Sequence, residues 1–403
     1  MSEAGASVRD GPAMASPLAY RPQLDGLRAL AVTAVLFHHF WSPETDAGSQ
    51  GVRTFFVLSG LLITQILLQP RAGSTMQAMA SFYIRRSLRI FPIYFVVVLA
   101  AIAVIPEVRA TALWHLTYTS NFLFAVEGEW APWMVSHLWS LDVEEQFYLL
   151  WAPFVLLAPR RLFLPVTIAL IAAAPLCRAA FEQAQPGGPA AYGLLPGSMD
   201  ALGVGALLAV VERRRLWPGL KPGLLLIGGL LALPVLFVVW WNTPLLMGHG
   251  VWVDTVALIP IAAIVLGASR GASGVVGRVL ASAPLIGLGK ISYGVYLLHL
   301  LVLWALLKTP VFAQQPHGPA TFVVGTAVTI ALAALSWRVL ERPLNGLKRR
   351  YPYAAAVPVV KMQQSPLRPS ANPLDDGDVP LERRGPLGAR SLSGAGRTPR
   401  RER

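Results

Sequence analysis

The sequence has few charged residues and almost no cysteine. Lys, Arg, Asp and Glu make up 14% of its 403 residues, whereas a soluble domain carries about 25%. The single cysteine, Cys177, excludes an intramolecular disulfide and any CxxC-type metal or redox site. Hydrophobic residues make up 54% of the chain and the mean hydropathy is +0.53. Because they come in long runs, the sequence predicts an all-α polytopic membrane protein and not a soluble one.

About ten apolar runs are candidates for membrane-spanning helices. Such a helix needs about 20 mostly apolar residues, with a range of roughly 17 to 25. The runs lie near residues 24–41, 52–69, 90–106, 146–158, 162–178, 198–211, 223–241, 251–268, 291–308 and 319–340. The fourth run is short, so its helix either is short or begins within the polar stretch before it.

Basic residues alternate from one connection to the next. Arg or Lys precedes the first run and follows every even-numbered run, whereas the odd-numbered connections are poor in both and two of them hold acids. Because cytoplasmic loops are enriched in Lys and Arg, this alternation predicts that both termini are cytoplasmic. The net charge of +13 therefore reflects topology and indicates no nucleic-acid partner. We divide the chain into a cytoplasmic segment 1–22, a membrane domain 23–345 and a cytoplasmic tail 346–403.

The tail is polar and basic. From residue 344 onward the chain holds 12 Lys and Arg against 5 Asp and Glu, and so supplies +7 of the net charge of +13. Its Pro, Gly, Ser and Arg cannot form a buried core, which predicts disorder. Such a tail is either inert or held against anionic lipid at the membrane surface.

The first apolar run contains four ionisable residues, Asp25, Arg28, His38 and His39. Such a side chain costs at least about 2.5 kcal/mol at the bilayer centre, so each is a candidate functional residue. At 100° per residue, His39 lies only about 20° from Arg28 around a helix, Asp25 about 40° from His39, and His38 about 80° from Arg28. The angles predict one polar stripe of Asp25, Arg28 and His39. The alternative is that His39 merely anchors the end of the helix at the membrane interface.

Two other patterns have both a structural and a functional interpretation. Ser59-Gly60, in the second run, allows helices to pack closely, and the Ser59 hydroxyl is also a candidate site group. Arg85, Arg86 and Arg89 share one helical face, at positions i, i+1 and i+4. They are either anchors that follow the charge rule or guanidinium groups that bind phosphates at the cytoplasmic mouth.

Acidic residues cluster just before the fourth run. The segment HLWSLDVEEQFYLLW contains Asp142, Glu144 and Glu145 with no Lys or Arg nearby. Acids that enter a membrane helix are costly unless they pair elsewhere, with Arg28 or a histidine for example, or take part in chemistry.

The ninth run begins ISYGVYLLH and adds Tyr293 and a second intramembrane histidine, His299. Both are further candidate site residues. No metal site is predicted.

Taken together, the motifs resemble the acyltransferase-3 family of membrane O-acyltransferases, over residues 20 to about 345. The segments that carry the resemblance are, in order, LDGLRALAVTAVLFHHF, FFVLSGLLIT, RRSLRIFP, LWSLDVEEQFYLLW, ISYGVYLLH and ERPL. The family's arginine and histidine separated by ten residues match Arg28 and His39. Its RRxxR-type motif matches Arg85, Arg86 and Arg89, which favours the phosphate-binding interpretation.

Two positions depart from the family pattern. Asp142 stands where Ser is common, and Arg53 follows Gly51-Val52 where an acid is often found. These departures leave the core motifs intact but put the shape of the outer mouth, and hence the acceptor, in doubt.

The resemblance implies an enzyme of the bacterial inner membrane that moves an acyl group, usually acetyl, from acyl-CoA to a hydroxyl of a carbohydrate or glycolipid. The implied partners are the donor acetyl-CoA, the acceptor and the bilayer, with no permanently bound cofactor. Acceptors in the family include O-antigen, exopolysaccharide, peptidoglycan, Nod factors and macrolides. One alternative is therefore acylation of a secondary metabolite such as a macrolide sugar. An alternative of another class is a proton-coupled transporter, because intramembrane ionisable residues also mark proton relays.

The resemblance also suggests a mechanism. Arg85, Arg86 and Arg89 are expected to hold the nucleotide phosphates while the pantetheine arm passes Arg28 towards His39. His39 is expected to act as a general base on the acceptor hydroxyl, or to take the acyl group covalently. Asp25 belongs to the same catalytic stripe. Glu144 or Glu145 is expected to orient the imidazole, as a carboxylate does in hydrolase triads.

Overall fold

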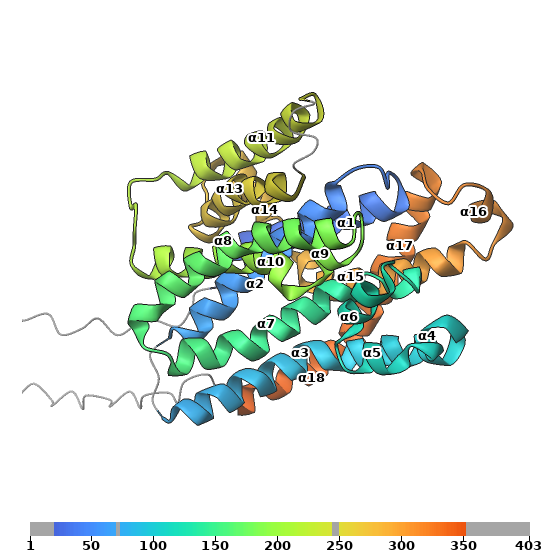
Figure 1. The fold of residues 1–403 in the computed structure, drawn as a ribbon, viewed down its shortest axis with the longest axis horizontal. Coiled ribbons are helices and arrows are strands. Elements are labelled where there is room, and N and C mark those ends of the chain that lie inside the picture. Colours follow the sequence, from blue (N-terminus) through green and yellow to red (C-terminus); the bar gives the residue numbers. More distant parts are fainter. Residues whose placement is uncertain (1–19, 70–72, 244–249, 352–403) are drawn as a thin grey trace, which may run out of the picture. The chain divides into compact units, whose positions relative to one another are not determined.

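The computed structural model describes residues 20–69, 73–243 and 250–351 (Figure 1). Every regular element in this part of the chain is a helix, which confirms the predicted all-α class. The predicted disorder of the tail 346–403 concerns residues that lie mostly outside the described ranges, and so does most of the predicted segment 1–22.

Ten helices of at least 18 residues coincide with the ten predicted runs. They are α1 (Pro22–Phe40), α2 (Ala47–Leu67), α3 (Thr75–Val104), α7 (Leu138–Leu157), α8 (Arg160–Ala184), α10 (Leu195–Arg213), α11 (Pro222–Trp241), α13 (Gly250–Ser269), α15 (Ala283–Leu306) and α17 (Pro319–Ser336). Shorter helical segments connect or follow them: α4 (Pro106–Ala110), α5 (Ala112–Leu116), α6 (Ser120–Glu127), η1 (Trp133–Val135), α9 (Ala190–Gly193), α14 (Gly274–Leu280), α16 (Pro310–Gln314), η2 (Trp337–Glu341), α18 (Arg342–Gly346) and η3 (Leu347–Arg350).

Eight helical stretches of the described chain are long and apolar enough to cross a membrane. Among the ten long helices, α1 and α7 fall short of this because they carry ionisable residues. The protein is thus a polytopic, multi-pass membrane protein, while the number of ten spans and their orientation stay predictions.

The structure corrects one predicted boundary and decides between two alternatives at another. The helix predicted near residue 90 begins at Thr75, because Ser74 starts it with a capping box. The Ser74 hydroxyl accepts a hydrogen bond from the Gln77 amide, and the Gln77 side chain accepts one from the Ser74 amide. The helix of the short fourth run, 146–158, begins at Leu138, within the polar stretch before it, which confirms the second of the two alternatives and places its acids inside the helix.

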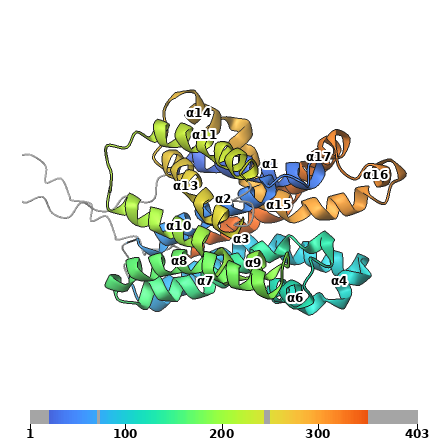
Figure 2. The same cartoon turned by 45° about the horizontal axis from the view of Figure 1, so that its top comes forward.

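The central helices α1 and α2 pack against each other, with α10 against α2 and α15 against α1. Further out, α8 packs on α10 and α17 on α15, while α11 and α13 form a pair of their own (Figures 1 and 2). In both views the short helices α4, α5, α6 and α16 gather at one end of the helical bundle.

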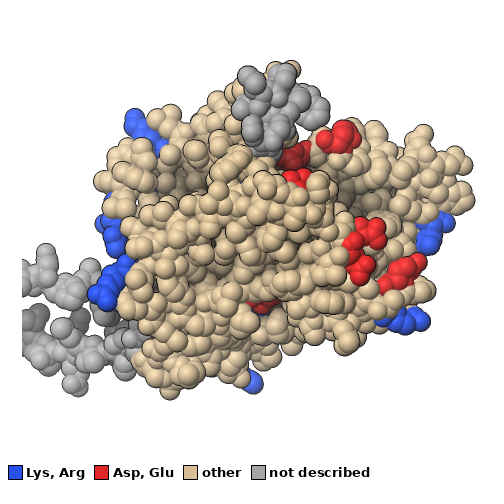
Figure 3. Space-filling view, in the orientation of Figure 1, with Lys and Arg blue, Asp and Glu red and all other residues tan. Residues whose placement is uncertain are grey.

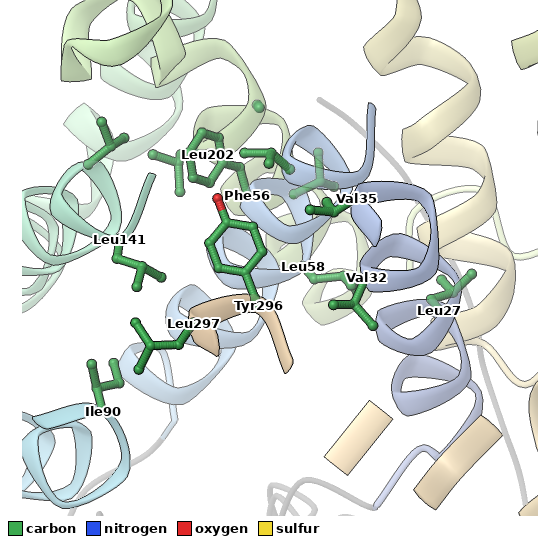
Figure 4. Packing of buried hydrophobic residues seen from close by; sticks show 14 of the residues in the cluster. Leu27, Val32, Val35, Phe56, Leu58, Ile90, Leu141, Leu202, Tyr296 and Leu297 are labelled. Carbon is green, nitrogen blue, oxygen red and sulfur yellow. The ribbon is translucent and has the colours of Figure 1, made fainter. Parts of the chain in front are cut away.

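Buried apolar side chains form one continuous cluster inside this arrangement. Figure 4 shows part of it, with Tyr296 of α15 among Phe56 and Leu58 of α2 and Leu141 of α7. The close packing predicted at Ser59-Gly60 is confirmed, because a Cβ atom on Gly60 would lie 2.1 Å from the carbonyl oxygen of Leu202 in α10.

Charged side chains are distributed unevenly over the surface. On the face shown in Figure 3, Lys and Arg appear at both ends of the molecule, whereas most Asp and Glu lie towards the end where α4, α5, α6 and α16 gather. A broad surface without charge lies between them.

Candidate active site

A first cavity, which we call the basic pocket, has a volume of about 620 Å³. Its walls come from α1, α2, α3, α7, α15 and the segment after α17. Its charged lining residues are Asp25, Arg28, Arg85, Arg86, Arg89, Glu144, Lys290 and Lys348. Six cations against two acids make this cavity strongly cationic, which suits a polyanionic ligand.

Arg28 and Asp25 form an ion pair in the wall of the basic pocket. Arg28 Nη1 lies 2.9 Å from Asp25 Oδ1, one helical turn away, and the Tyr20 hydroxyl donates a hydrogen bond of 2.7 Å to Asp25 Oδ2. Asp25 is therefore the partner of Arg28, and the acids of α7 are not. The pair lies on the stripe that the helical angles predict.

The three arginines of α3 all line the basic pocket, as their shared face predicts. Arg85 Nη1 donates hydrogen bonds to the carbonyl oxygens of Lys348, at 2.6 Å, and Tyr351, at 3.0 Å. The Arg86 guanidinium lies 4.5 Å from the centroid of the Tyr148 ring, within the range of a cation–π contact.

The three acids of α7 lie in different places and have different partners. Glu144 lines the basic pocket, where Ser59 donates a hydrogen bond of 2.6 Å to its Oε1 atom. Glu145 lines neither large cavity, and its Oε1 atom has no hydrogen-bond partner among the described residues. Asp142 accepts hydrogen bonds from the Ser120 hydroxyl and the Asn121 amide, so it holds the beginning of α6.

The prediction that Glu144 or Glu145 orients His39 is therefore wrong. Neither carboxylate hydrogen-bonds to an imidazole in the described part of the chain. The two acids lie on the second turn of α7, and Glu144 faces the other cavity.

A second cavity, which we call the histidine pocket, has a volume of about 520 Å³ and contains His39 in its wall. His39 Nδ1 donates a hydrogen bond of 3.0 Å to the carbonyl oxygen of Val35. The proton is thereby assigned to Nδ1, which leaves Nε2 as an unprotonated base. His38 also lines this pocket, and its Nδ1 donates to the carbonyl oxygen of Thr45 at 2.7 Å.

Two more imidazoles extend inward from His39. The ring of His299 lies 4.8 Å from that of His39 and 4.9 Å from that of His137, measured between centroids. His299 is fully buried and lines neither large cavity, whereas His137 lines the histidine pocket. In the described residues, no three His, Cys, Asp or Glu side chains are placed to hold a metal ion.

The two cavities share a wall made of Val52, Phe56 and Tyr296. The hydroxyl groups of Tyr296 and Ser140 lie 2.6 Å apart, next to the carbonyl oxygen of His137. Tyr293, one turn earlier on α15, lines only the basic pocket and donates a hydrogen bond to the carbonyl oxygen of Ile90. A group that passes from one cavity to the other therefore meets this wall.

A buried network of charges beside the histidine pocket was not predicted from the sequence. Arg53 Nη2 lies 3.0 Å from Asp200 Oδ2, and Arg178 Nη2 lies 2.8 Å from the same oxygen. Asp254 lies 3.8 Å from Arg53 Nε and lines the pocket. These residues could have been found in the sequence. Arg178, Asp200 and Asp254 are ionisable residues inside predicted apolar runs, and this is the criterion by which Arg28 was chosen as a candidate.

Comparisons with known proteins agree with this architecture. Residues 21–338 match the acyltransferase-3 family by its acyltransferase domain. The chain is 31% identical over 361 residues to a putative peptidoglycan O-acetyltransferase, YrhL, of Bacillus subtilis, covering 81% of this chain and 55% of that one. It is 30% identical over 354 residues to the peptidoglycan O-acetyltransferase OatA of Listeria monocytogenes, covering 81% and 56%.

The O-acetyltransferase OatA of Staphylococcus aureus is 27% identical over 376 residues, which cover 85% of this chain and 60% of the relative. The chain thus spans little more than half the length of the curated relatives that it matches. No solved structure matches it. Since the matching domain covers most of the chain, this protein belongs to the acyltransferase-3 family.

Proposed function

We propose that this protein is an O-acetyltransferase that carries acetyl from cytoplasmic acetyl-CoA to a hydroxyl of a cell-wall carbohydrate on the other side of the membrane. The observation that carries the proposal is the pair of cavities on either side of one wall, one cationic and one containing an unprotonated imidazole nitrogen. The relatives named peptidoglycan O-acetyltransferases support a glycan acceptor. These relatives support neither the transporter nor the macrolide alternative.

The charge of the basic pocket supports this cavity as the binding site of the donor. Arg85, Arg86 and Arg89 project from consecutive turns of α3 into the same cavity, where guanidinium groups can bind phosphate oxygens in pairs. The acetyl end of the donor extends past Arg28 towards Tyr296 in the shared wall. Because Asp25 already neutralises Arg28, that arginine acts as a positioning group and not as an added phosphate ligand.

The transfer is assigned to His39. Its Nε2 atom accepts the proton of the acceptor hydroxyl while the hydroxyl oxygen attacks the thioester carbonyl. The carbon–sulfur bond breaks, the coenzyme A thiolate leaves and takes up the proton from the imidazole, and the acetyl ester remains on the acceptor. The histidine is thus restored without a covalent acyl-enzyme.

The test is acetyl transfer from labelled acetyl-CoA in membranes that contain the wild type, His39→Ala, Arg28→Ala, His38→Ala or His317→Ala. The products are separated into polymer, glycolipid and small-molecule fractions. We expect loss of the base in His39→Ala to lower kcat by about 10²- to 10⁴-fold. His317 is exposed, lines neither large cavity and donates a hydrogen bond of 3.0 Å to the carbonyl oxygen of His39. Because His317→Ala removes this backbone contact but keeps the His39 imidazole, it should lower activity far less than His39→Ala.

Each result has a defined meaning. Label in the polymer or glycolipid fraction supports the glycan acceptor, and label only in the small-molecule fraction contradicts it. Full activity in His39→Ala together with loss in His38→Ala would assign the base to His38. Absence of label in every fraction, with protein present in the membrane, would refute acetyl-CoA as the donor.

A further inference from the structure

One wall of the histidine pocket is aromatic. Trp130 and Trp139 line it with their ring centroids 5.9 Å apart, and Tyr192 lines it as well. Trp139 is held in place by Phe56, whose ring lies edge-on at 5.9 Å. Both indoles are only half-buried, so part of each ring stays open for contact. An aromatic wall with a few polar groups suits a ligand that has one apolar face and a rim of hydroxyl groups, such as a pyranose ring.

Charges beside the pocket nearly cancel. The Arg53 guanidinium contacts Asp200 and the carbonyl oxygen of Asp254 through Nη2, and its Nε atom faces the Asp254 carboxylate. Behind it, Arg178 is fully buried and binds Asp200. Two guanidinium groups thus face two carboxylates in a network that is neutral as a whole.

The remaining carboxylate is that of Asp46, at the N-terminal end of α2. It lines the pocket, and its closest polar contact is the Gln50 side chain, which donates a hydrogen bond of 2.9 Å. With neutral imidazoles at His38 and His39, the charged residues that line this pocket leave one negative charge in excess.

We infer that the histidine pocket binds an uncharged saccharide and discriminates against one that carries an anionic group, with Asp46 as the specificity-determining residue and Trp130 and Trp139 as the stacking surface. This inference rests on the proposed function, since it defines the charge of the acceptor at that site. It also bears on Arg53, which stands where the family often has an acid and which could be expected to attract an anionic acceptor. Arg53 is neutralised by its partners and so is not available to attract an anionic acceptor.

The pH dependence of the discrimination follows from Asp46. Asp46 is an exposed residue at the edge of the pocket. The protein atoms around its carboxyl and the negative charge of Asp254 raise its pKa to about 6, against the hydrogen bond from Gln50 and the charge of Arg53, which lower it. As the pH falls through 6, this carboxyl takes up a proton and loses its charge, so the discrimination should weaken. The other ionisable groups that face the pocket are His38, His39, His137, Tyr192, Arg53 and Asp254. The variant Asp46→Asn keeps all of them and isolates the contribution of Asp46.

The experiment measures binding and not transfer. The purified full-length protein in lipid nanodiscs is titrated with methyl N-acetylglucosaminide and with the matching uronate, in which a carboxylate replaces the C6 hydroxymethyl group, by ligand-observed NMR. At pH 7.5 we expect the wild type to bind the neutral glycoside about tenfold more tightly, the effect of one nearby like charge near a protein surface. Asp46→Asn should reduce this preference to less than about threefold.

Two further variants serve as controls. Glu44→Gln removes an exposed acid two residues away that does not line the pocket, and it should keep the wild-type preference. Trp139→Ala should weaken the binding of both glycosides by about three- to tenfold, since it removes a stacking surface. At pH 5 the wild type should fall to the preference of Asp46→Asn, because the uronate, with a carboxyl pKa of about 3.5, stays ionised.

Three results would each overturn the inference. The wild type could bind both glycosides equally, it could bind neither, or Asp46→Asn could keep the full preference for the neutral glycoside. Its failure can be told apart from that of the proposed function. Selective binding without any acetyl transfer would refute the proposed function and leave the inferred specificity intact. Acetyl transfer without selective binding would support the function and refute the specificity.

Discussion

Arg86 shows how a single side chain of this protein keeps a charge inside a membrane domain. Its guanidinium lies 4.5 Å from the centroid of the Tyr148 ring, in a cavity that also contains Glu144. A planar, delocalised cation can stack on an aromatic face and still present its edge to a phosphate. The ammonium group of a lysine is a compact and strongly hydrated charge, so it would lose both properties.

We expect Arg86→Gln to raise the KM for acetyl-CoA by about tenfold or more, the effect of losing one hydrogen bond to a charged group, with kcat changed less than KM. The measurement is initial transfer rate against donor concentration in isolated membranes. Arg213→Gln is the matched control, because Arg213 is an exposed arginine that lines neither large cavity. An unchanged KM in Arg86→Gln would argue against phosphate binding by this residue.

At the scale of helices, α2 and α10 meet through glycine on both sides. A Cβ atom on Gly60 would lie 2.1 Å from the carbonyl oxygen of Leu202, and one on Gly205 would lie 2.2 Å from that of Val57. Both neighbours are backbone atoms, which cannot move without moving their helix. This contact fixes the distance between α10, which carries Asp200, and α2, which carries Arg53, and so it supports one side of the histidine pocket.

Gly60→Ala should therefore destabilise the protein by about 1–3 kcal/mol, the usual cost of inserting a methyl group into a filled helix contact. The thermal unfolding midpoint of the purified protein in detergent reports this change. Gly228→Ala, in α11, is the control, since a Cβ atom there meets nothing within 4 Å. That variant should be neutral or more stable by roughly 0.5–1 kcal/mol, because alanine favours the helix. A midpoint that falls equally in both variants would contradict the close contact at Gly60.

For the molecule as a whole, the distribution of charge and the position of the cavities point to the same orientation. The basic pocket includes Lys290 and Lys348, which belong to segments predicted to be cytoplasmic. The histidine pocket includes Asp46, from a connection predicted to be external. A donor from the cytoplasm and an acceptor from outside would thus reach opposite sides of the wall at Tyr296.

The orientation can be tested with single cysteines in a Cys177→Ala background. Glu129→Cys should react with a membrane-impermeant maleimide in intact cells, because its connection is predicted to be external. Arg214→Cys, in a connection predicted to be cytoplasmic, should react only after the membrane is permeabilised. Both positions are exposed in the structure, so the difference reports the side of the membrane and not burial. The opposite pattern of labelling would reverse the predicted topology.

The long helices and the polar stripe of α1 could be predicted because their causes are local. Apolar runs of sufficient length must form helices in lipid, where every backbone group needs an internal partner. The helical period alone places Asp25 and Arg28 on a common face. The start of α3 was missed because its first turns are polar and are set by the capping box of Ser74. The start of α7 stayed open between two alternatives because its acids interrupt the apolar run, and the structure selects the earlier one.

The sequence by itself determined the all-α membrane class, the ionisable residues of α1 and the shared face of Arg85, Arg86 and Arg89. Only the tertiary structure decided that Glu144 meets Ser59, 85 residues away in the chain, in the basic pocket and not His39. It also decided that His137 and Asp254 join His39 at the other cavity. The physical reason is that the helical period fixes which way a side chain points, whereas the packing of helices far apart in the chain fixes what it meets.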